Sequence, residues 1–176
     1  MIDLTPACRQ MSDLLSVVTD DQLELPTPCA EFTVRGLIEH VDEAVQGFTT
    51  LASAAPGPGD VRSHVLELAE AWSSPRAWAG ETAVAGVHLR NELWGNIALT
   101  EVVVHGWDLA RATGRPFDLP DGTLRACLAH VRVFVPSAPL PELWGAPVSV
   151  VDDAPLVDQI VAVTGRVPGS AGRRAG

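Results

Sequence analysis

The segment from residue 96 to residue 113 constrains the fold most, because it has the pattern of a helix that is apolar on almost every face. Leucine, valine and alanine side chains cover most of its helical wheel, and Gly114 followed by Pro116 ends the run. Such a helix is stable only when other elements surround it. We therefore expect a helical bundle in which this helix is largely buried.

Three ionisable residues share one stripe of this apolar helix. With Glu101 at zero on a wheel of ~100° per residue, His105 falls at about +40° and Asp108 at about −20°. A solvent-exposed face would explain such a stripe simply. The apolar neighbours favour burial instead, and a buried carboxylate and imidazole need hydrogen bonds, ion pairing or a metal ion.

The pair Glu101 and His105, one helical turn apart, can direct two donor atoms at one ion. A catalytic zinc site needs a third ligand and an open position. His40 is the best candidate, because it lies at the edge of the apolar stripe of its own helix. Gly36 and Gly47 flank it and leave space for a neighbouring helix or a ligand.

Other interpretations of these residues stay open at this stage. Taken alone, His40 fits a hydrogen-bonded structural histidine, and His130 is the second candidate ligand. His64 and His88 are interpreted as ordinary histidines. Asp108 is expected either to orient a ligand histidine from behind, or to form a surface pair with a nearby arginine, Arg111.

The cysteines and tryptophans favour structural roles. Cys8, Cys29 and Cys127 are odd in number and far apart, which fits reduced thiols and excludes a disulfide framework and a Cys-x-x-Cys zinc site. Cys29 lies just ahead of a helix start, where a thiol pKa can fall, although a buried thiol is the simpler interpretation. The tryptophans are expected in the core, with pocket lining as the alternative.

The rest of the chain predicts further helices and two irregular regions. Residues 73–95 are interpreted as a long connection without a convincing hairpin, and residues 167–176 as a disordered tail after a single domain, 1–166. The additional helices are expected at 5–18 with Thr5 as N-cap, 33–52, 60–72 with Asp60 as N-cap, 123–135, and a short stretch from 152–155 to 164.

Composition excludes several function classes. The 22 acidic residues outnumber 12 basic ones, which are all arginine, so the formal net charge is −10. This charge argues against nucleic acid or an anionic membrane surface as a partner. The absence of lysine excludes Schiff-base chemistry and a lysine-containing phosphate loop. Without a long apolar span or a signal-peptide pattern at the start, a cytoplasmic location is expected.

Two motifs carry a resemblance to a known family. They are LPTPCAEFTVRGLIEHV at 25–41 and TEVVVHGWDLARATG at 100–114, and the stretch 144–166 is also typical. The chain resembles the DinB-like superfamily. Within it, the chain is most similar to mostly uncharacterised actinobacterial proteins related to the metal-binding N-terminal domain of mycothiol-dependent maleylpyruvate isomerase.

The resemblance implies an all-α fold, a DinB-like four-helix bundle with additional short helices over residues 1–166. It further implies a divalent metal, zinc before nickel, held by His40, Glu101 and His105. No catalytic residue is assigned beyond this metal site. Asp108 is the expected support behind the ligands.

The function that the resemblance implies is activation of a low-molecular-weight thiol, with mycothiol as cosubstrate, for transfer to or isomerisation of a small electrophile. The isomerase carries a further C-terminal domain with a catalytic arginine, which this chain is expected to lack, so isomerase activity itself is not carried over. The alternatives are a metal-dependent hydrolase that uses metal-bound water, and a non-catalytic metal-binding or stress-response module. The expected partners are a small-molecule thiol, an electrophile and a second copy of the chain in a homodimer.

Overall fold

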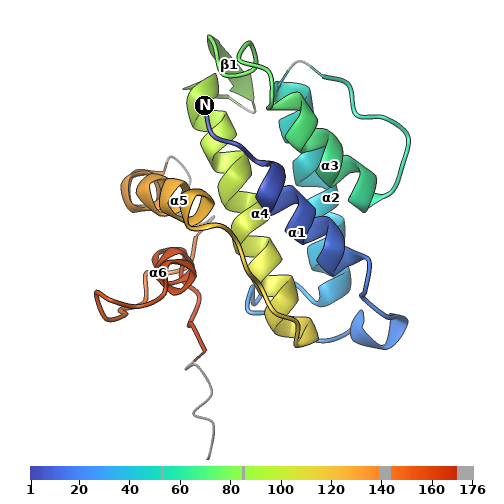
Figure 1. Cartoon of the computed structure of the whole chain (residues 1–176), viewed down its shortest axis with the longest axis vertical. Helices are drawn as coiled ribbons and strands as arrows, with labels where there is room; N and C mark the ends of the chain where they lie inside the picture. Colours follow the sequence, from blue (N-terminus) through green and yellow to red (C-terminus); the bar gives the residue numbers. More distant parts are fainter. Residues whose placement is uncertain (53, 85, 139–143, 170–176) are drawn as a thin grey trace, which may run out of the picture.

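The computed structural model describes residues 1–52, 54–84, 86–138 and 144–169. Within these ranges the chain forms six α-helices and one antiparallel hairpin (Figure 1). The all-α class is therefore confirmed, whereas most of the predicted disordered tail, 170–176, lies outside the described residues. The elements are α1 (Thr5–Leu15), α2 (Val34–Leu51), α3 (Val61–Ala71), β1 (Glu81–Val84), β2 (Val87–Arg90), α4 (Asn91–Thr113), α5 (Asp121–Phe134) and α6 (Leu156–Val163), with short 3-10 helices at Asp20–Gln22 and Val135–Ser137.

Four of the helices form a bundle around the core. Helix α1 packs against α3 and α4, and α2 packs against the same two helices, so the four close into a ring. Helices α5 and α6 pack on each other, and α5 contacts α4 from the side opposite to α1–α3 (Figure 1). None of the helices in the described ranges is both long enough and apolar enough to cross a membrane.

Helix α4 is enclosed from both sides, as its sequence predicts. Every residue from Val102 through Ala110 is buried. This includes His105, which is 6% exposed, and Asp108, which has no exposed surface. The alternative interpretation of the polar stripe as a solvent-exposed face is therefore wrong for these two residues, because the bundle covers one side of α4 and α5 the other.

Local capping groups mark the ends of α2, α3 and α4, and those of α3 and α4 are the ones that the sequence predicts. The Thr33 side chain accepts a hydrogen bond from the Gly36 amide, and the Asp60 side chain accepts one from the Ser63 amide. Gly114, with φ of +67°, ends α4 in the left-handed conformation that glycine adopts without strain.

The predicted cap of α1 is wrong. Thr5 is the first helical residue, Leu4 takes the N-cap position without a side-chain hydrogen bond, and the Asp3 carboxylate accepts the Thr5 amide. The helix also ends at Leu15 rather than at residue 18. At this end the Ser16 hydroxyl donates a hydrogen bond to the Asp13 carbonyl in the last turn. Helices α5 and α6 are displaced by a few residues from their expected bounds.

The predicted long connection without a hairpin over residues 73–95 is wrong. This region forms the β1–β2 hairpin, and α4 begins at Asn91 rather than at residue 96. The Asn91 side chain donates to the Ala79 carbonyl and accepts from the Thr82 hydroxyl, and the Trp94 indole donates to the Thr82 carbonyl. These side-chain hydrogen bonds attach the hairpin to the start of α4. They involve single residues and produce no periodic pattern in the sequence, so the sequence did not predict them.

Gly95 explains why the sequence does not predict the first turn of α4. A glycine inside a helix normally weakens it, so this position reads as a break. In the structure, a Cβ at Gly95 would lie 2.7 Å from the Trp78 ring and 2.8 Å from the Trp72 ring. The missing side chain therefore lets two buried indoles pack directly on the helix backbone.

We expect Gly95→Ala to lower the free energy of unfolding by about 1–3 kcal/mol, because the indoles must move to admit a methyl group. Gly47→Ala is the matched control in α2, where a Cβ would meet nothing within 4 Å. It should raise the free energy by about 0.5–1 kcal/mol through helix propensity. Urea denaturation measures both, and equal effects of the two variants would contradict this packing.

His64, interpreted as an ordinary histidine, is a buried structural residue that links three segments and belongs to no candidate ligand group among the described residues. Its Nδ1 lies 2.7 Å from the Asp42 carboxylate on α2, and its Nε2 lies 3.1 Å from the Gly57 carbonyl. Both ring nitrogens thus face oxygen acceptors, which favours the doubly protonated ring. The hydrogen bond with Asp42 accordingly raises the pKa of His64 above 6.5.

The raised pKa predicts a pH-dependent stability. The interaction contributes fully below about pH 6.5 and is lost as the pH rises through the folded pKa of His64. Urea denaturation at about pH 6 and about pH 9 should show that Asp42→Asn destabilises the protein more at the lower pH. An equal loss at both pH values would contradict the prediction.

Candidate metal centre

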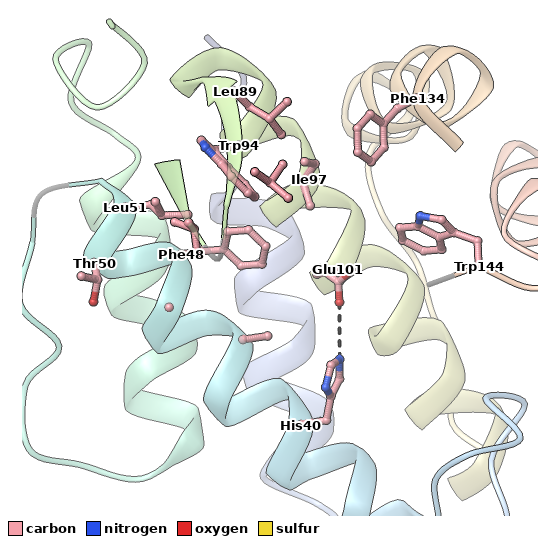
Figure 2. Close-up of a pocket in the computed structure, with 14 residues that line it drawn as sticks. His40, Phe48, Thr50, Leu51, Leu89, Trp94, Ile97, Glu101, Phe134 and Trp144 are labelled. Atoms are coloured by element: carbon pink, nitrogen blue, oxygen red, sulfur yellow. Dashed lines mark ion pairs between the residues drawn. The ribbon is translucent and has the colours of Figure 1, made fainter. Parts of the chain in front are cut away.

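The structure brings the three predicted ligand residues together where α2 packs against α4. One Glu101 carboxylate oxygen lies 3.2 Å from His105 Nε2 and 3.6 Å from His40 Nε2. The donor atoms of all three side chains lie within 4.8 Å of one another. Figure 2 shows the His40 ring facing the Glu101 carboxylate across the gap between the two helices.

The surroundings of His40 explain its orientation. Its side chain is 35% exposed, and the Phe32 ring stacks on its imidazole with centroids 5.0 Å apart. A Cβ at Gly36 would already touch Phe32, so the space expected beside this glycine holds an aromatic ring rather than a ligand. The space beside Gly47 is open.

Asp108 supports His105 from the other side of the ring. Its carboxylate lies 3.1 Å from His105 Nδ1 and accepts two hydrogen bonds from the Arg166 guanidinium, at 2.9 and 3.3 Å. A carboxylate that accepts the Nδ1 proton fixes the orientation of the ring, so that Nε2 faces Glu101. The predicted alternative, a surface pair with Arg111, is wrong, because Asp108 is fully buried and its cation is Arg166.

Arg166 is the residue at this site that sequence reasoning missed. It follows Gly165, whose φ of +85° ends α6 in a left-handed turn. The guanidinium is 7% exposed and also donates to the Thr164 carbonyl. No local pattern marks a partner 58 residues from Asp108 in sequence, so only the tertiary structure reveals this ion pair.

The charges at the site depend on one another. Burial raises the pKa of Glu101, but the imidazoles of His105 and His40 outweigh it and hold the pKa at about 2. Burial likewise lowers the pKa of His105, whereas Asp108 and Glu101 raise it to about 9. Without a metal the site therefore keeps an ionised carboxylate and a protonated His105 at neutral pH. A metal ion would displace that proton, because imidazole binds metals only in its neutral form.

The two donor-atom distances from Glu101 fit a divalent ion. Ligand atoms at 2.0–2.1 Å from a tetrahedral ion lie about 3.4 Å apart. The two distances from Glu101, 3.2 and 3.6 Å, lie on either side of this value. The His64–Asp42 pair of the same molecule is much closer, at 2.7 Å, as expected for a direct charge-assisted hydrogen bond. Two histidines and one carboxylate are also a donor set of catalytic zinc sites.

The other candidate residues, His130 and Cys29, do not belong to the group formed by His40, Glu101 and His105. His130, the second candidate ligand, stacks on Phe134 in α5 and belongs to no such group among the described residues, and burial lowers its pKa to about 4. Cys29 lies within 4.8 Å of His105 and Asp108. Burial raises the pKa of the Cys29 thiol, which favours the buried structural thiol over the activated thiol considered from the sequence.

A cavity of about 570 Å³ opens next to the three residues (Figure 2). His40 and Glu101 lie in its wall, which is otherwise almost entirely apolar. The expectation that the tryptophans fill the core holds for Trp72, Trp78 and Trp107, which are buried, whereas Trp94 and Trp144 line this cavity.

Comparison with known proteins agrees with this architecture. The profile of the mycothiol maleylpyruvate isomerase N-terminal domain matches residues 4–67, a segment that includes His40. Two uncharacterised proteins of Mycobacterium tuberculosis, from strains CDC 1551 / Oshkosh and ATCC 25618 / H37Rv, are each 30% identical over 167 residues, which cover 87% of this chain and 90% of theirs. No solved structure matches the chain.

The helical bundle and the sequence matches together define a DinB-like protein. Within that class, the chain belongs to the family of the mycothiol maleylpyruvate isomerase N-terminal domain.

The buried pair at the back of the site generates a stability prediction. Arg166→Met should cost about 3–5 kcal/mol, because it leaves the Asp108 charge buried without its main partner. Asp108→Asn combined with Arg166→Met should cost less than the sum of the two single changes. Arg125→Met, which removes an exposed pair on α5, is the control and should cost at most about 0.5 kcal/mol by urea denaturation. Similar losses in Arg166→Met and Arg125→Met would contradict the role of Arg166.

Proposed function

We propose that the protein is a divalent-metal-dependent enzyme that activates a low-molecular-weight thiol for attack on a small electrophile. The observation that carries the proposal is the convergence of the His40, Glu101 and His105 donor atoms within 4.8 Å of one another, beside a large cavity whose wall contains His40 and Glu101. Zinc is the preferred ion, with nickel as the alternative, and mycothiol, which the name of the family contains, is the proposed thiol.

A bound divalent ion would supply a strong local positive charge that lowers the pKa of a thiol at its open position. The side chains of this protein prepare that position. Asp108 holds His105 in the tautomer whose Nε2 faces the site, and Arg166 holds Asp108. Phe32 fixes the plane of the His40 ring. Within the described residues the ligand group has three members, which leaves space for a substrate.

The nucleophile in this proposal comes from the small thiol rather than from the protein. Burial raises the pKa of the Cys8 and Cys127 thiols to about 12, so neither is a ready nucleophile. The small thiol loses its proton to solvent, and its sulfur lone pair forms a carbon–sulfur bond. In a transfer, the leaving group departs with the bonding electron pair; in an isomerisation, the new bond breaks again and returns the thiol. The cytoplasm, where such thiols stay reduced, is the proposed location.

Metal analysis tests the proposal directly. Protein prepared with zinc, nickel or cobalt in excess should hold about one ion per chain. His40→Ala and Glu101→Ala should lower the affinity by about a hundredfold or more. His88→Ala is the matched control, because His88 is exposed on β2 outside the ligand group, and it should bind the ion as wild type does.

Cobalt-loaded protein then tests the thiol. Addition of mycothiol should change the visible spectrum, because sulfur would join the coordination sphere. Absence of metal from wild-type protein, or equal binding by wild type and His40→Ala, would refute the metal site. Turnover of an ester or amide without added thiol would refute the thiol step and favour a hydrolase.

A further inference from the structure

The cavity beside the three candidate ligand residues is lined by α2, the hairpin, α4, α5 and the segment that contains Trp144. Phe48 and Leu51 come from α2, Leu89 from the hairpin, and Trp94 and Ile97 from the first turns of α4. Trp144 faces these residues from the opposite side, and Glu101 lies between the two walls (Figure 2). The volume of about 570 Å³ lies within the range of small-molecule sites.

The few charged groups in the cavity wall restrict which ligands it can bind. Among the described lining residues, Glu101 is the only acidic group, His40 is the only potential cation, and arginine is absent. The chain has no lysine at all. A dicarboxylate such as maleylpyruvate would therefore meet no guanidinium in this wall, and its carboxylates would lose their hydration without an arginine to compensate them.

Two tryptophans line the cavity, and the indole N–H of Trp94 already has a partner, whereas the buried indole N–H of Trp144 has none among the described residues. The Trp94 indole N–H donates to the Thr82 carbonyl of the hairpin, at 3.0 Å. This bond holds the ring by its polar edge, and the remaining surface available to a ligand is aromatic carbon. Phe48 lies against Trp94 with ring centroids 6.5 Å apart, so the two rings form one continuous apolar wall.

We propose that this cavity binds an uncharged, apolar small molecule, aromatic or branched aliphatic, as the electrophilic substrate of the enzyme. The assignment as substrate rests on the proposed function, whereas the binding itself does not require a metal. This proposed preference for an uncharged ligand distinguishes the chain from an enzyme that binds dicarboxylates, because the cavity wall offers apolar surface and no arginine. Binding places one end of the molecule beside His40 and Glu101.

Gly47 provides a way to fill the cavity without disturbing the core. It lines the cavity from α2, is exposed, and a Cβ there would meet nothing within 4 Å. Gly122 in α5 has equally free space and does not line the cavity. The same large residue can therefore be introduced at both positions, and only the variant at Gly47 should obstruct binding.

The probes are N-phenyl-1-naphthylamine, which is uncharged, and 8-anilinonaphthalene-1-sulfonate, which carries the same rings with one negative charge. Dye fluorescence and energy transfer from tryptophan are measured on metal-free wild-type protein and on the protein after zinc addition. The neutral dye should bind about tenfold or more tightly than the sulfonate. Trp94→Phe should reduce the energy transfer, because Trp94 lies in the wall.

Variants with a large residue at Gly47 or Gly122 test whether the dye binds in this cavity. Gly47→Leu and Gly47→Phe should weaken the neutral dye progressively, by about tenfold or more for the larger residue, while Gly122→Phe binds as wild type does. Circular dichroism and urea denaturation establish that each variant is folded. Tighter or equal binding of the sulfonate, no binding of the neutral dye, or equal binding by Gly47→Phe and Gly122→Phe would overturn the proposal. Normal dye binding by a protein that takes up no zinc, nickel or cobalt when these ions are supplied in excess would refute the proposed function while leaving this cavity assignment intact.

Discussion

The ion pair between Asp108 and Arg166 is the interaction on which the organisation of the site depends. A carboxylate without exposed surface in the middle of an apolar helix is unfavourable unless a cation and hydrogen bonds compensate it. Arg166 supplies both, and it ties the segment after α6 to the centre of α4. The compensated Asp108 then orients His105, and His105 together with His40 keeps Glu101 ionised. The site is thus one connected network of charges rather than three independent side chains.

The glycines of the bundle show how one residue type serves two opposite purposes. At Gly95 the missing side chain lets the buried indoles of Trp72 and Trp78 pack on the backbone of α4. At Gly47 the missing side chain leaves open space in front of the candidate metal centre. Both positions weaken their helices by propensity alone. The first position gains packing in return, and the second leaves room for a ligand.

The candidate site could be predicted in outline from the sequence because its main part is local. Glu101 and His105 are one turn apart on a helix whose apolar neighbours indicate burial, and His40 lies at the edge of another apolar stripe. The structure brings these three side chains together, while their role as metal ligands stays a prediction. Arg111 was the wrong partner for Asp108, because helical spacing finds only neighbours in sequence.

The sequence by itself determined the helical class, the burial of α4 and the polar stripe on it, since each follows from periodicity within one segment. The tertiary structure alone decided the hairpin, the early start of α4, the Asp108–Arg166 pair and the cavity. These features depend on contacts between segments far apart in the chain, such as Trp78 on Gly95 and Arg166 on Asp108. From the sequence, a glycine in a helix or a charge in an apolar helix is expected only to destabilise it. The tertiary contacts that offset this destabilisation form only when the chain folds.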